Sequence, residues 1–116
     1  MATATVTKTA KKMTTAERNA AIHAKAHKAG TEAMESSSLE HGGCGFAWIK
    51  VVPGTSSFAR WAKKEGVGRS TAVGSGVNIW VRHRTQSEDR KFAYAAAYAA
   101  VLNEEGIRAY PESRTD

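Results

Sequence analysis

The stretch at 44–52 constrains the fold most, because it is the most apolar run in the chain. Alternate residues of a strand point to opposite faces. One face would carry the bulky Phe46 and Trp48, and the other would carry smaller apolar residues. Both faces are apolar apart from Lys50, the one charged residue in the run. The pattern therefore predicts a strand whose two faces are both buried by packed helices. Pro53 then ends the strand, since it cannot donate to the ladder.

A first helix is predicted from a capping box. Thr14 and Glu17 have the spacing at which each side chain can bond the other's backbone amide. The helix should end at Gly30 or fray on to Met34, because glycine favours helix ends. Ile22 is its one large aliphatic residue, so we expect this helix to anchor only lightly.

A second, short helix is predicted after the hydroxyl residues at 55–57, which are good N-caps. Phe58, Trp61 and Ala62 have the spacing of one helical face. Gly66 is a natural stop. We expect this helix to lie between the first two strands.

The last third of the chain indicates a strand, a long helix and a short strand. Residues 77–83 alternate between apolar and polar, and an Ala-rich helix follows, with Ser87 as its N-cap and Gly106 as its end. A short strand at 107–110 comes last. A helix joining two strands favours a right-handed parallel crossover. We therefore predict an α+β fold, with a three-stranded mixed sheet in which the second and third strands are parallel neighbours, and the long helix on one face.

The chain of 116 residues is expected to form one folded unit with loose ends. The predicted segments are a disordered basic arm (1–13), an N-terminal helix (14–34), a linker (35–42), the α+β core (43–111) and a tail (112–116). A single cysteine, Cys44, leaves no intramolecular disulfide, which favours a reducing, intracellular setting. No run approaches the length of a membrane span, so no membrane partner is expected.

The charge of the chain favours an anionic partner. The formal net charge is +6 and the isoelectric point about 9.7, a balance that favours polyanions such as DNA or RNA. Arginines gather around Trp80, where they could pair with phosphates while the ring stacks on a base. Equally, their stems could simply cover the ring. The residues expected to contact nucleic acid are Lys63, Lys64, Arg69, Trp80, Arg82, Arg84 and Arg90.

A protein partner is the alternative. Trp80, Tyr94 and Tyr98 could anchor a host or defence protein, because tryptophan and tyrosine dominate binding hot spots. The two tyrosines also fit a place in the core or a contact between helices. Both interpretations stay open at this point.

Metal or thiol chemistry is the least favoured hypothesis. His23 and His27 are four residues apart, and His41 with Cys44 could complete a zinc site. The pair lacks the glutamate of the metalloprotease motif, so we expect imidazoles that face solvent. Cys44 at the start of an apolar strand fits a small buried hydrophobe better than a nucleophile. We therefore predict no enzyme activity, no cofactor and no bound metal.

Five short segments carry a resemblance to a known family. They are Gly43–Trp48, Gly76–Val81, Gln86-Ser87, and Gly106–Tyr110 with Ser113-Arg114. Over residues 40–116 the chain resembles a family of short uncharacterised proteins of tailed bacteriophages. Members end in Ser-Arg-Met-Asp, and Thr115 replaces the methionine here. The resemblance implies a phage origin and the host cytoplasm, and no activity. With the charge, it predicts a small non-enzymatic accessory protein that binds nucleic acid; it predicts no oligomeric state.

Overall fold

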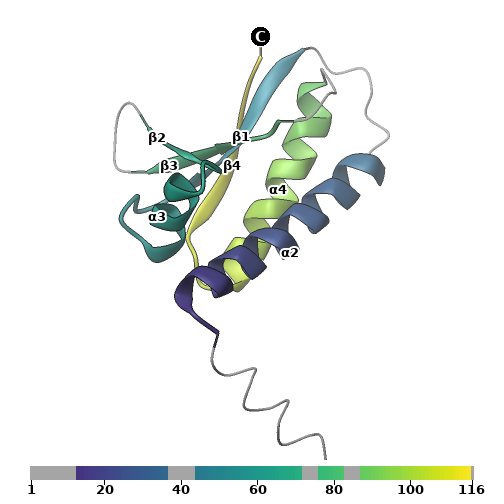
Figure 1. The fold of residues 1–116 in the computed structure, drawn as a ribbon. Helices are drawn as coiled ribbons and strands as arrows, with labels where there is room; N and C mark the ends of the chain where they lie inside the picture. The colour runs from purple at the N-terminus through teal and green to yellow at the C-terminus, as the bar shows by residue number, and fades with distance from the viewer. Residues whose placement is uncertain (1–12, 37–43, 72–75, 83–86, 116) are drawn as a thin grey trace, which may run out of the picture.

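The computed structural model describes residues 13–36, 44–71, 76–82 and 87–115. Within them three helices pack on one face of a four-stranded sheet (Figure 1). The elements in chain order are α2 (Thr15–Ser36), β1 (Gly45–Val51), α3 (Ser57–Lys64), β2 (Arg69–Ser70), β3 (Val77–Trp80), α4 (Glu88–Glu104) and β4 (Ala109–Thr115). The predicted α+β class is confirmed.

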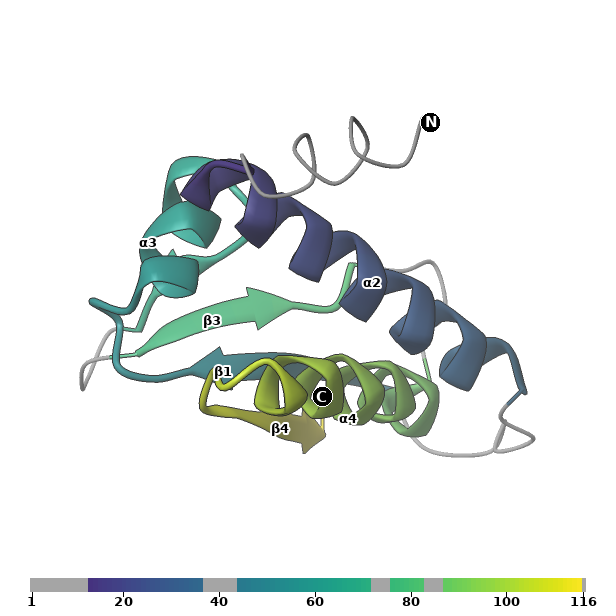
Figure 2. The ribbon, with the colours of Figure 1, turned by 90° about the horizontal axis from the view of Figure 1, so that it is seen from below.

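The sheet has the order β2-β3-β1-β4, and every neighbouring pair is antiparallel. The predicted three-stranded mixed sheet is therefore wrong in strand number and in pairing. The strands that flank α4, β3 and β4, do run in the same direction, as a crossover requires. In Figure 2 their arrows point one way and that of β1 the other. They are not neighbours, because β1 lies between them and satisfies the hydrogen bonds of both.

The hydrophobic core lies between the helices and the small-residue face of β1. Ala47, Ile49 and Val51 on that face are fully buried. Opposite them α4 contributes Ala95, Ala99 and Leu102 to the same core. The short alanine side chains let the helix approach the sheet closely, as the sequence predicts. Burial of this face is the main stabilising contribution, since each large aliphatic side chain contributes about 1.5–3 kcal/mol.

The other face of β1 is not covered by any of the described elements. Burial alternates strictly along the strand: Phe46 is exposed, and Trp48 and Lys50 are half-buried. The predicted burial of both faces is therefore wrong. All three described helices pack on the same side, and an antiparallel sheet can leave its second face to solvent. The bulky side chains instead pack against one another across the strands.

Helix α2 is longer and more firmly packed than predicted. It continues past Gly30, and α2 and α4 lie side by side (Figure 1). A β-carbon built on Gly30 would lie 2.7 Å from Cδ2 of the Tyr94 ring. The glycine therefore serves close contact between two helices and does not end the helix. The buried residues, at a spacing of three or four, are Asn19, Ile22, Ala26, Gly30 and Met34. This helix is thus part of the core and is not lightly anchored.

The predicted capping box is confirmed. The Thr14 amide donates to Glu17 Oε1 at 2.9 Å, and the Glu17 amide donates to Thr14 Oγ1 at 3.1 Å. Each side chain thus satisfies an amide that the first helical turn leaves without a partner.

The predicted boundaries of α3 and α4 are also confirmed. Ser56 accepts from the Ala59 amide, and Ser87 accepts from the Arg90 amide. The chain leaves the two helices through Gly66 (φ 78°) and Gly106 (φ 84°), in the left-handed region that glycine tolerates.

The C-terminal segment differs from the prediction. β4 pairs with β1 from Ala109 to Thr115, so residues 112–115 of the predicted tail belong to the sheet. Pro111 lies inside this strand and not after it. An edge strand tolerates proline because one row of its amides needs no ladder partner.

Most of the predicted arm (1–13) and linker (35–42) lies outside the described residues; Glu35 and Ser36 belong to α2. None of the described helices combines the length and apolar character that a bilayer crossing requires.

Candidate functional site

The uncovered face of the sheet is the most distinctive surface of the molecule. Directly opposed residues of antiparallel strands share a face, so the register places side chains from all four strands on the same surface. We call this surface the open face. Its residues are Phe46, Trp48, Lys50, Arg69, Asn78, Trp80, Tyr110, Glu112 and Arg114.

Aromatic rings form a continuous cluster across the centre of the open face. Trp48 and Trp80 are directly opposed on β1 and β3, with ring centroids 4.6 Å apart. Phe46 meets Trp80 edge-on at 6.3 Å. Phe46 is 38% exposed, and Tyr110 on β4 is 48% exposed. Apolar groups that gather on one face and are not covered by the described elements make this surface a candidate for binding.

Hydrogen bonds and cations fix the orientation of these rings. Trp48 Nε1 donates to Glu112 Oε1 at 2.7 Å, which holds the indole in one plane. Lys91 donates to the Gly45 carbonyl at 3.0 Å, and its Nζ lies 5.4 Å from the Phe46 centroid. Arg114 Cζ lies 5.6 Å from the same centroid. The rings therefore meet a ligand in a preset arrangement, which lowers the entropy cost of binding.

The open face is positively charged. Lys50, Arg69 and Arg114 lie on it, and Arg82 follows two residues after Trp80. Among the described residues these four cations have no carboxylate within ion-pair distance; the ion pair that is formed joins Lys25 and Glu105 on the helical side. Glu112 is the acidic residue on this face, and it is engaged by the Trp48 indole.

The structure separates the sequence-predicted contact residues into two groups. Arg69, Trp80 and Arg82 lie on or beside the open face. Lys63 and Lys64 are exposed in the last turn of α3, which packs with α2 on the opposite side of the sheet.

The two remaining predicted residues are Arg90 and Arg84. Arg90 is half-buried in the first turn of α4, and its Nε has no hydrogen-bond partner among the described residues. Arg84 lies outside the described residues.

The sequence pattern misses most of the aromatic cluster. It assigns Phe46 and Trp48 to the core, and it places Tyr110 in a short strand and Arg114 in a tail. Lys50 is the residue that indicates exposure of this face, because a lysine at the centre of a strand is rarely buried without a partner.

The tyrosines predicted as protein anchors lie inside the helical layer. Tyr94 is buried and Tyr98 fully so. The Tyr98 hydroxyl is 2.6 Å from Nδ1 of His23, and the Tyr94 hydroxyl is 2.5 Å from Nδ1 of His27. The core alternative for these tyrosines is confirmed, and they form no surface with Trp80, which lies on the opposite face of the sheet.

The predicted solvent-facing imidazole is wrong for His23, which is half-buried against α4, whereas His27 is exposed as predicted although its Nδ1 also meets Tyr94. Burial, with the nearby charge of His27, lowers the pKa of His23 from 6.5. Burial raises the pKa of Tyr94 to about 12, and burial with the neighbouring Tyr94 raises the pKa of Tyr98. His23 and the two tyrosines therefore stay neutral near pH 7 and join two helices.

The described residues contain no group of three or more histidine, cysteine or acidic side chains that could hold a metal ion. His41 lies outside them, so a site that includes it stays a hypothesis. Cys44 is exposed, one residue before β1. The prediction of a small buried hydrophobe is wrong there, because Cys44 is two residues before the exposed Phe46 and so lies on the side of the open face.

No protein-family model matches the chain, and neither a curated protein nor a solved structure is significantly similar to it.

Proposed function

We propose that the protein binds single-stranded nucleic acid through the open face. The observation that carries the proposal is the coincidence of partly exposed aromatic rings with unpaired cations on one sheet surface. Unpaired bases stack on aromatic side chains at about 1–3 kcal/mol per base, and a positive groove follows the phosphates. The phage setting remains a prediction of the family resemblance alone.

The single-stranded form is favoured because the rings can only stack on bases that are free. A duplex buries the faces of its bases, whereas loops and single strands can splay them out. Phe46 and Tyr110 are the most exposed rings of the cluster. Tyr110 is opposite Lys50, so the two rings are about four strand residues, or roughly 13 Å, apart along β1. That span gives a flexible strand at least two separate stacking platforms.

The cations of the open face supply the salt-dependent part of the affinity. Lys50, Arg69, Arg82 and Arg114 would each neutralise a phosphate. For single strands the slope of log affinity against log salt is about −0.7 per phosphate, so four contacts predict a slope of about −3. The dissociation constant should then rise roughly fiftyfold between about 50 and 200 mM salt.

The test is fluorescence anisotropy with a labelled oligothymidine and a hairpin duplex of equal charge. The expected result is a preference for the single strand, together with a salt slope of about −3. Equal affinity for both probes would mean that binding depends on charge alone, and it would contradict the proposal that bases stack on the exposed rings. The absence of any binding at low salt would overturn the proposal.

A matched pair of variants isolates the aromatic contribution. Phe46 on the open face and Phe92 on α4 are the same residue type, and both are 38% exposed. We expect Phe46→Ala to weaken single-strand binding about tenfold or more, in line with the loss of one stacked base. Phe92→Ala should leave binding unchanged. Equal effects of the two variants would contradict a role for the open face.

A further inference from the structure

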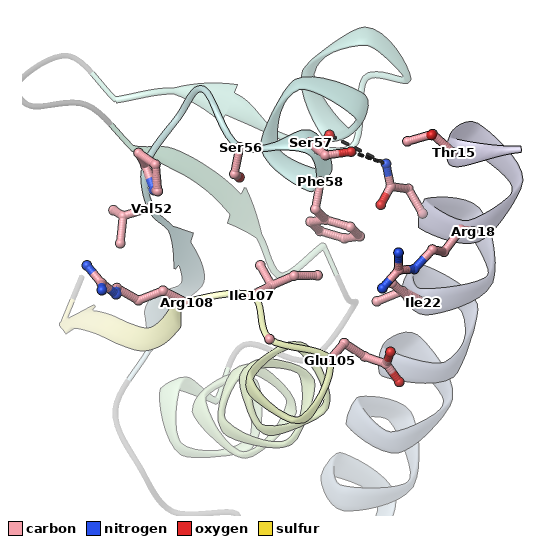
Figure 3. Close-up of a pocket in the computed structure, with 13 residues that line it drawn as sticks. Thr15, Arg18, Ile22, Val52, Ser56, Ser57, Phe58, Glu105, Ile107 and Arg108 are labelled. Atoms are coloured by element: carbon pink, nitrogen blue, oxygen red, sulfur yellow. Dashed lines mark hydrogen bonds between the residues drawn. The ribbon is translucent and has the colours of Figure 1, made fainter.

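A separate cavity of about 440 Å³ opens on the helical side of the molecule. The first turns of α2, the loop that leads into α3, and the turn between α4 and β4 surround it (Figure 3). Its volume lies within the roughly 300–1,000 Å³ usual for small-molecule sites. It shares no residue with the open face, so a ligand in this cavity is independent of nucleic-acid binding by the sheet.

The inner wall of this cavity is apolar. Ile22 and Phe58 are buried in the core, and Ile107 is half-buried above them. Figure 3 shows the Phe58 ring and the Ile107 side chain turned towards the space between α2 and the turn after α4. This wall suits the apolar body of a ligand and offers little to a small inorganic ion.

Two unpaired cations lie on the rim. In Figure 3 the Arg18 side chain extends from α2 into the opening, and Arg108 lies along the far side beneath Val52. Neither guanidinium has an ion-pair partner among the described residues. The one acidic residue lining the cavity, Glu105, is 3.6 Å from Lys25 Nζ, which offsets its charge. The rim therefore attracts anions.

A buried polar side chain adds a directional contact. Asn19 is only 5% exposed and lines the cavity. Its Nδ2 donates to Ser57 Oγ at 3.2 Å and to the Ser57 carbonyl at 3.5 Å, which fixes the orientation of the amide. Its Oδ1 accepts no hydrogen bond within the described part of the chain. This oxygen is not among the buried polar atoms that lack a partner, so it stays accessible and can accept from a ligand N–H or O–H.

We propose that this cavity binds a small organic anion, a phosphate or carboxylate joined to an apolar body that carries a hydrogen-bond donor. Arg18, whose side chain enters the opening, holds the anionic group, and Arg108 on the far side adds positive charge to the rim. The apolar body rests on Ile107 and Phe58, and its donor meets Asn19 Oδ1. A nucleoside monophosphate and an indole carboxylate both have this chemistry, and the two are distinguished by titration.

The test is a ¹H–¹⁵N NMR titration of the intact chain with four probes: adenosine monophosphate, indole-3-acetate, adenosine and inorganic phosphate. We expect one of the two amphipathic anions to shift amides around the cavity saturably, at least about tenfold more tightly than adenosine or phosphate. The stronger of the two shows which combination of anionic group and apolar body the cavity prefers. No saturable shift with either anion at about 5 mM would overturn the proposal, and so would equal binding of adenosine.

Two arginine variants test the geometry. Arg18→Gln removes the charge that enters the cavity, whereas Arg60→Gln removes an exposed charge on α3 that does not line it. We expect the first variant to weaken binding about tenfold, and the second to leave it unchanged. Neither should alter thermal stability or single-strand affinity at the open face. If both variants weaken binding equally, the effect comes from the net charge of the protein and not from Arg18 in the cavity, and the proposed site is refuted.

Discussion

Replacing Gly30 by alanine tests how closely α2 packs on α4. A β-carbon at this position would lie 2.7, 2.8 and 2.9 Å from three atoms of the Tyr94 ring. Real β-carbons do not approach other heavy atoms this closely, so either the ring or the helix must move. The ring cannot swing freely, because its hydroxyl is hydrogen-bonded to His27 on the same helix as Gly30.

The expected magnitude follows from three opposing contributions. Alanine inside a helix is favoured over glycine by about 1 kcal/mol. Overpacking a well-filled contact costs about 1–3 kcal/mol. A displaced Tyr94 ring also weakens its hydrogen bond to His27, which costs about 1 kcal/mol. We therefore expect Gly30→Ala to lower the free energy of unfolding by about 2 kcal/mol, which is a fall of roughly 8 °C in Tm for a chain of this size.

The assay is urea unfolding followed by circular dichroism. Ala24→Gly is the matched control, because Ala24 is exposed on the same helix and reports helix propensity alone. It should lower stability by about 1 kcal/mol. If Gly30→Ala instead raises stability by about the same amount, α2 does not pack against Tyr94, and the reasoning about this contact is wrong.

Three further predictions concern charge and protonation. Glu112→Gln removes the negative charge of the open face but keeps an oxygen that can accept from Trp48. The affinity for a single strand, measured by anisotropy, should therefore rise about two- to fivefold at low salt. An unchanged affinity would mean that the strand does not approach Glu112. Because folding lowers the pKa of His23 below 6.5, the unfolded chain binds the proton first as the pH falls. Urea unfolding should therefore show a His23-dependent stability that is complete above pH 6.5 and decreases below it; a constant difference between wild type and His23→Gln from about pH 7 to about pH 5 would refute this linkage. Absorbance at alkaline pH should show that Tyr94 and Tyr98 stay protonated near pH 11 in the folded protein and ionise when guanidinium unfolds it; full ionisation of all three tyrosines in the folded protein would contradict their burial.

Local signals in the sequence predict local structure well. The capping box at Thr14, the N-caps at Ser56 and Ser87, and the left-handed glycines after α3 and α4 are all found where expected. Each depends on residues within a few positions of one another, so the backbone chemistry alone determines it.

Long-range features are harder to predict. The crossover gives the correct relative direction of β3 and β4, yet nothing in their sequences shows that β1 lies between them. Gly30 has the signature of a helix end. Only the ring of Tyr94 explains why glycine is needed inside the helix, and this ring comes from α4, with its hydroxyl on a histidine 67 positions earlier in the chain.

The candidate site is predicted in part. Charge and alternation single out Arg69, Trp80 and Arg82, which lie on or beside the open face. The same approach assigns Phe46 and Trp48 to the core, because an apolar face predicts burial whether or not a helix is available to cover it. The helices pack on the face of β1 that has the smaller side chains, Ala47, Ile49 and Val51, because these allow a closer approach than the bulky rings of the other face.

The most direct test of the open face is photochemical crosslinking to a single strand that carries 5-iodouracil, followed by mass spectrometry. This base crosslinks to aromatic rings on which it stacks. We expect the crosslinked residues to be Phe46, Trp48, Trp80 or Tyr110, all on the open face. Crosslinks confined to α2 or α3, with the strand still bound, would contradict the central claim that nucleic acid binds the uncovered side of the sheet.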